Sequence, residues 1–80
     1  MKVRFYGKLA DLFGSEREVA LDMPCTVADL RRQLATDHPH AAESLANKRV
    51  KACIGDEIVQ DSDVIPEDGV LELLAPVSGG

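Results

Sequence analysis

A helix surrounded by short alternating segments is the feature that most restricts how this chain can fold. Val27, Leu30 and Leu34 recur at helical spacing. Thr26 stands just before them, with Asp29 three residues later, as in a capping box. Pro39 disfavours helix at the residue before it, so we expect the helix to end near Asp37. The polar positions are expected to face water: Asp29, Arg31, Arg32 and Gln33.

The segments on either side alternate between apolar and polar residues, which is typical of half-buried strands. The pattern predicts strands at 2–6, 18–23, 50–54, 57–59 and 70–74, and a short helix at 8–13. One helix can cover one face of a single sheet, so the fold class is α+β, a mixed sheet packed on one main helix. We expect the last strand to lie between the first and the third.

The inward-facing positions of these elements define the expected core. It consists of Val3, Phe5, Val19, Leu21, Val27, Leu30, Leu34, Ile54, Leu71 and Leu73. A chain of 80 residues is long enough for one such core, so we expect one domain over residues 1–75.

Residues 76–80 are expected to form a flexible Gly-Gly tail. Pro76 lacks an N–H and cannot continue a sheet ladder. After Val77, the small residues Ser78, Gly79 and Gly80 suit a narrow channel and tolerate many backbone angles. The α-carboxylate of Gly80 is ionised at neutral pH and can attack the α-phosphate of ATP, which gives an acyl-adenylate. Two terminal glycines also arise by chance, so this interpretation depends on the fold that precedes them.

Charge is distributed unevenly along the chain. The formal net charge is −5, every Lys and Arg lies at or before Lys51, and the segment from Asp56 to Glu72 is acidic without a base. This distribution argues against nucleic acid as a partner. It indicates either an acidic region near the tail that is steered to a basic partner or a solvated acidic surface. The sequence has neither a membrane-length apolar run nor a signal-peptide pattern, so no membrane partner and a cytoplasmic location are expected.

The cysteines and histidines do not match a metal-site pattern. Cys25 and Cys53 are far apart in sequence and are expected to be reduced thiols. His38 and His40 flank Pro39 and are expected to face solvent in a loop. We therefore predict no metal site.

Strand alternation also predicts a partner-binding surface on the sheet face away from the helix. Tyr6 and Leu74 fall on that face, and Ile58 is expected to join them. Arg4, Lys51 and Glu72 should surround these apolar side chains. Exposed large apolar residues within a charged rim are typical of a docking site, although single exposed apolar residues are also common.

The chain resembles the β-grasp, ubiquitin-like sulfur carriers, and among them the small subunits of molybdopterin synthase. Leu74-Ala75-Pro76 stands where that family often has Phe-Pro-Pro. The matching segments are Lys2-Val3-Arg4-Phe5-Tyr6-Gly7, Thr26-Val27-Ala28-Asp29-Leu30-Arg31, Glu67-Asp68-Gly69 and Pro76-Val77-Ser78-Gly79-Gly80.

The resemblance implies a carrier mechanism. An E1-like adenylating enzyme would activate the Gly80 carboxylate with Mg-ATP, and a sulfurtransferase would supply the sulfur for a thiocarboxylate. The large subunit of molybdopterin synthase would then receive the tail and transfer the sulfur to a pterin precursor. The chain would bind no cofactor itself, and its partners would provide the catalytic groups.

Other functions remain open at this point. The same tail chemistry serves carriers for thiazole synthesis and for tRNA thiolation, and it begins protein modification by ubiquitin-like modifiers. A β-grasp interaction module without tail chemistry is an alternative from a different class.

Overall fold

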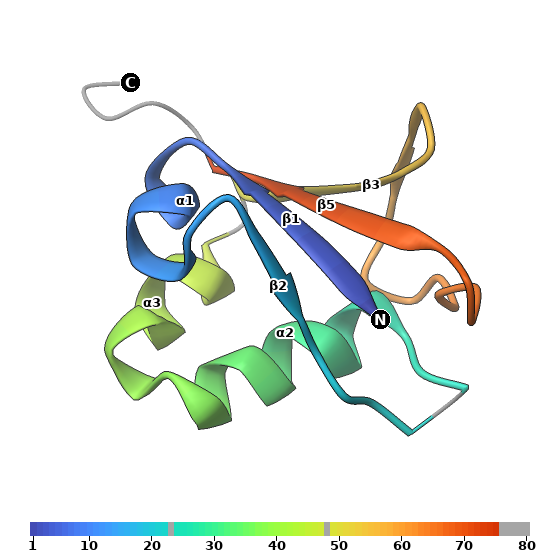
Figure 1. Cartoon of the computed structure of the whole chain (residues 1–80), viewed down its shortest axis with the longest axis horizontal. Coiled ribbons are helices and arrows are strands. Elements are labelled where there is room, and N and C mark those ends of the chain that lie inside the picture. Colours follow the sequence, from blue (N-terminus) through green and yellow to red (C-terminus); the bar gives the residue numbers. More distant parts are fainter. Residues whose placement is uncertain (23, 48, 76–80) are drawn as a thin grey trace.

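The computed structural model of the chain describes residues 1–22, 24–47 and 49–75. Helices α2 and α3 lie against one side of a sheet, and α1 closes one end of it (Figure 1). The α+β fold expected from the sequence is therefore confirmed. The elements in chain order are β1 (Lys2–Tyr6), α1 (Lys8–Phe13), β2 (Glu16–Glu18), α2 (Val27–Asp37), the 3-10 turn η1 (Pro39–Ala41), α3 (Ala42–Ala46), β3 (Lys51–Ile54), β4 (Glu57–Val59) and β5 (Val70–Leu74).

The sheet has the strand order β2-β1-β5-β3-β4, so the last strand lies between the first and the third as predicted. β5 runs parallel to β1 and antiparallel to β3. Leu71 and Leu73 on β5 are buried and stand in register with Val3 and Phe5 on β1. These inward residues form the side of the sheet that the helices cover.

The second strand differs from the expected one. We predicted a strand over 18–23, but β2 covers Glu16–Glu18 and its three residues are exposed. β2 pairs with β1 in the register Lys2↔Glu18, and the Val19 amide already bonds to the Met1 carbonyl at 2.8 Å. Glu18 is therefore the last residue of this ladder, and residues 19–22 lie outside any strand. The alternation at 18–22 reflects partial burial without a ladder, since Val19 is buried and Leu21 is half-buried, and Met23 lies outside the described residues.

Helix α2 begins with the capping box that the sequence indicates. The Thr26 amide donates to Asp29 Oδ2 at 3.0 Å, and the Asp29 amide donates to Thr26 Oγ1 at 3.2 Å. These hydrogen bonds lower the pKa of the Asp29 carboxyl, with the Thr26 backbone bond the largest cause. The Val27 and Ala28 amides donate to carbonyls of the loop before β5, so the first turn has acceptors for its amides.

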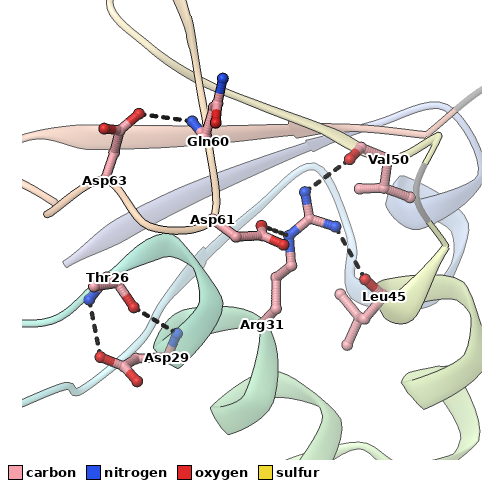
Figure 2. A network of polar contacts seen from close by, with 8 residues as sticks. All are labelled: Thr26, Asp29, Arg31, Leu45, Val50, Gln60, Asp61 and Asp63. Atoms are coloured by element: carbon pink, nitrogen blue, oxygen red, sulfur yellow. Dashed lines mark hydrogen bonds and ion pairs between the residues drawn. The ribbon is translucent and has the colours of Figure 1, made fainter.

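Arg31 is the main departure on this helix, because it does not face water. Its side chain is only 16% exposed and lies between α2, α3 and the loop after β4 (Figure 2). Nη1 donates to the Leu45 carbonyl at 3.1 Å and Nη2 to the Val50 carbonyl at 2.7 Å. Nε lies 3.0 Å from Asp61 Oδ1, as an ion pair rather than an aligned hydrogen bond. Arg31 thereby satisfies two carbonyls at the ends of α3 and β3.

The core between sheet and helices contains the predicted residues with two exceptions. Leu21 and Ile54 are half-buried and pack at its edge. The core also takes in residues not assigned to it from sequence, among them Leu9, Phe13, Leu45 and Ile65. The buried residues named in the prediction are Val3, Phe5, Val19, Val27, Leu30, Leu34, Leu71 and Leu73.

Replacing Leu30 tests whether this helix face carries the stability of the fold. Leu30 is fully buried. We expect Leu30→Ala to lower the free energy of unfolding by roughly 2–5 kcal/mol, because the substitution removes buried surface and leaves a cavity. Denaturation in urea, followed by circular dichroism, measures the change.

Leu12→Ala is the matched control, since Leu12 is 37% exposed. We expect this substitution to lower the unfolding free energy by about 1 kcal/mol or less. A loss of less than about 1 kcal/mol for Leu30→Ala would mean that the helix face is assigned incorrectly.

Candidate functional site

The site begins where β5 ends. β5 finishes at Leu74, and the Ala75 amide donates to the Tyr6 carbonyl at 3.3 Å. Ala75 is half-buried and packs against the core, so the chain is held through residue 75. The predicted tail residues lie outside the described part of the chain, and the structure gives only the point from which they continue: Pro76, Val77, Ser78, Gly79 and Gly80.

Three apolar side chains are exposed on the sheet face away from α2. We call Tyr6, Leu74 and Ile58 the Tyr6 patch; they are 42%, 38% and 70% exposed. Tyr6 and Leu74 are direct neighbours in the β1–β5 register. Ile58 is on β4, where it pairs with Cys53, so β3 separates it from Leu74. The registers thus bring Tyr6 and Leu74 together and set Ile58 apart on the same face.

Charged residues surround the Tyr6 patch as the alternation predicts. In the strand register, Arg4 on β1 stands opposite Glu72 on β5, and Lys51 on β3 stands opposite Leu74 on β5. The Tyr6 hydroxyl donates a 2.7 Å hydrogen bond to Glu72 Oε2, and this bond is the main cause that raises the pKa of Tyr6. The ring therefore stays neutral at physiological pH and holds a defined orientation beside Leu74.

The sequence left open whether the acidic segment lies near the tail or forms a solvated surface, and the structure places all of its acids except Glu72 before β5. We call the end of the sheet where β5 finishes the exit end, and the opposite end the loop end. The turn at Gly55-Asp56 follows Ile54, which pairs with Leu71 near the start of β5. Glu67 and Asp68 precede β5 directly. These acids therefore belong to the loop end, whereas Lys51 stands beside Leu74 at the exit end.

His38 is half-buried, which corrects the expectation that both histidines face solvent. Its ring meets Phe13 edge-on with 5.0 Å between centroids. Arg17 Nη1 donates to His38 Nε2 at 2.6 Å, so Nε2 acts as the acceptor. His40 is exposed, as expected. Phe13 and Arg17 are distant from His38 in the sequence, so no local pattern indicated this contact.

Cys25 and Cys53 are present as thiols. Burial raises the pKa of the Cys25 thiol, and the nearby Asp29 adds to the shift. A thiol held protonated in this way is a weak nucleophile at neutral pH. Within the ranges that the structure describes, His, Cys, Asp and Glu do not gather in a group of three that could hold a metal ion.

This arrangement is suited to presenting the C-terminal end of the chain to a partner. A central strand delivers the chain to the exit end, beside an apolar patch with a fixed aromatic ring. Among the described residues, none of the helices is long and apolar enough to cross a membrane.

Comparison with solved structures shows the same architecture elsewhere. SAMP1 from Haloferax volcanii superimposes with a TM-score of 0.80 at 23% identity, over 99% of this chain and 97% of that one. A Pyrococcus furiosus protein assigned as molybdopterin converting factor, subunit 1, also gives a TM-score of 0.80, at 20% identity over 95% of both chains. At these identities the likeness establishes the fold, which is the ubiquitin-like β-grasp.

Family membership follows from the sequence match. A comparison with curated proteins found no match. The ThiS family, in contrast, matches residues 3–80, which include the strands that frame the Tyr6 patch and the terminal Gly79-Gly80. The chain therefore belongs to the ThiS family and has the β-grasp fold that its resemblance to ubiquitin-like sulfur carriers implied.

Proposed function

We propose that this protein is a sulfur carrier that uses its C-terminal glycine, as the small subunit of molybdopterin synthase. The observation that carries the proposal is the ThiS-family match through Gly80, on a domain whose central strand leads to that tail. The Pyrococcus furiosus neighbour, assigned as molybdopterin converting factor, subunit 1, supports a pterin precursor as the final acceptor.

The proposed chemistry starts at the Gly80 carboxylate. An E1-like adenylating enzyme binds Mg-ATP, and a carboxylate oxygen attacks the α-phosphorus and displaces pyrophosphate. The terminal sulfur of a sulfurtransferase persulfide then attacks the acyl carbon and displaces AMP, which gives an acyl disulfide. A thiol reduces its S–S bond, so that the carrier is released as a thiocarboxylate and the thiol and the sulfurtransferase cysteine are left as a disulfide. The carrier itself holds no cofactor in this scheme.

The domain contributes docking and positioning. The Tyr6 patch is the proposed contact surface for the large subunit of molybdopterin synthase, and its neighbours Tyr6 and Leu74 lie at the end of the sheet where β5 finishes. A partner bound there would hold Gly80 close to its active site, which turns sulfur transfer into a reaction within one complex. The large subunit would provide the catalytic groups.

Substitution of Leu74 tests the Tyr6 patch. We expect Leu74→Asp to weaken binding to the large subunit about tenfold or more, because a charge would be desolvated at the centre of an apolar contact. Thermal stability should stay nearly unchanged, since Leu74 is on the exposed face. Isothermal titration calorimetry measures the affinity.

Leu12→Asp provides the control, because Leu12 is 37% exposed against 38% for Leu74 and lies on α1, outside the patch. We expect the affinity of this variant to match that of the unaltered protein. Equal affinities for Leu74→Asp and the unaltered protein would exclude the Tyr6 patch as the docking surface.

The chemistry is tested by the mass of the intact protein after incubation with the adenylating enzyme, Mg-ATP and a sulfur donor. The unaltered protein should gain the mass difference of one sulfur replacing one oxygen, and fragmentation should locate it at Gly80. Deletion of Gly80, or addition of a residue after it, should abolish the gain, because either change moves the terminal carboxylate away from the bound phosphate. Gly79→Val should reduce it through the added side chain.

Circular dichroism spectra of these tail variants should match that of the unaltered protein. Modification of the variants at the normal rate, or sulfur found on Cys25 or Cys53, would contradict the carrier mechanism. Transfer of the Gly80 acyl group from the adenylate to protein amines, in place of sulfur, would instead identify a ubiquitin-like protein modifier.

A further inference from the structure

Gly7 lies between β1 and α1 and stands directly against the last described residue of the chain. Its backbone angles are φ 67° and ψ −138°. A positive φ strains residues that have a side chain, and this ψ lies outside the small left-handed region that Asn and Asp tolerate. The backbone conformation at residue 7 is therefore one that glycine alone adopts without strain.

The space beside Gly7 sets a second requirement that is separate from the backbone angles. A Cβ added at Gly7 would overlap the Ala75 carbonyl oxygen and would lie 3.8 Å from the Ala75 Cβ. The overlapped oxygen belongs to the main chain, so the rotation of another side chain cannot make room for the added atom. Ala75 itself would have to move.

This second requirement distinguishes Gly7 from the other glycines with a positive φ. In the described ranges these are Gly14, with φ 84°, and Gly55, with φ 64°. A Cβ added at either of them would meet no atom within 4 Å. A side chain at Gly55 would therefore strain the backbone alone, whereas a side chain at Gly7 would also displace Ala75.

The main chain of Ala75 is held by the two residues at the end of β1. Its amide donates to the Tyr6 carbonyl at 3.3 Å, and its carbonyl oxygen lies against Gly7. Because the peptide group is planar, a carbonyl that is held in place also orients the bond by which the chain continues. Tyr6 and Gly7 together therefore determine where, and in which direction, the chain leaves the fold.

We infer that Gly7 is a positioning residue for the reaction at Gly80. The inference rests on the proposed function and adds a residue that belongs neither to the tail nor to the Tyr6 patch. Because Gly7 has no side chain, Ala75 can stay beside the end of β1, and the tail starts from a fixed point. A side chain at residue 7 would displace this point and misplace the terminal carboxylate in the enzyme complex, which slows its reaction.

The test follows formation of the acyl-adenylate in a single turnover, with the adenylating enzyme in excess over the carrier and Mg-ATP present. The maximum rate and the half-saturating enzyme concentration are measured separately. We expect Gly7→Ala to lower the maximum rate about tenfold, because the carboxylate is misplaced after docking. The half-saturating concentration should change less than about threefold, since the side chains of the docking surface are retained.

Two variants serve as matched controls. Gly55→Ala places the same side chain at nearly the same φ without a contact. Gly7→D-Ala, made by chemical synthesis, is the rescue variant, because a D-residue accepts a positive φ and its methyl group replaces the other hydrogen of this exposed glycine. The maximum rates of both controls should stay within about twofold of the unaltered rate.

An unchanged maximum rate for Gly7→Ala would overturn the inference. A loss of equal size for Gly55→Ala would also overturn it, since backbone strain anywhere in the fold would then suffice. The same holds for an equal loss in Gly7→D-Ala, which would show that any side chain disturbs this turn. Absence of an acyl-adenylate on the unaltered protein would instead contradict the proposed function, and the inference would then be decided without a partner.

NMR spectroscopy of the carrier alone provides this second measurement, and it applies even if Gly7→Ala does not fold. In the unaltered protein, nuclear Overhauser effects should connect an α-hydrogen of Gly7 to the methyl group of Ala75. In folded Gly7→Ala, the Ala75 amide should exchange with solvent about tenfold faster than in the unaltered protein, while the Leu73 amide keeps its protection. Missing Overhauser effects, or equal exchange of Ala75 in both proteins, would overturn the inference.

Discussion

The structure depends on β5 being held on both sides. Its pairing with β1 is parallel and its pairing with β3 is antiparallel, and both extend to Leu74. A central strand that stays paired to its last residue fixes where the chain leaves the fold. Because Leu71 and Leu73 bury their side chains against the helices, the same strand also completes the core. The described chain thus ends just after a strand that is paired on both sides.

Local signals in the sequence predicted much of this. The alternation in Val70–Leu74 identified β5 and its buried residues, and the Thr26–Asp29 pair identified the start of α2. The exposure of Tyr6 and Leu74 on one face follows from the same alternation. These features are encoded by neighbouring residues, so the sequence contains them directly.

Other features depend on contacts between distant segments. β2 ends at Glu18 because its register places Glu18 opposite Lys2, the first residue of β1, and the alternation at 18–23 cannot reveal this register. Arg31 is four residues after Val27, so the sequence could have predicted that it lies beside the apolar stripe of the helix. Its acceptors, the Leu45 and Val50 carbonyls, are known only from the tertiary structure. The acids of the loop end are close to the tail in sequence, and the direction of β5 places them at the other end of the sheet.

The account rests on β5 being ordered up to the point where the tail begins, and native-state amide hydrogen exchange measures this directly. The amides of Leu71, Glu72, Leu73 and Leu74 should exchange only through global unfolding. Their opening free energies should then equal the unfolding free energy measured in urea. Opening free energies for Leu73 and Leu74 several kcal/mol below the global value would contradict the account, because the end of β5 would then be frayed and could not fix the origin of the tail.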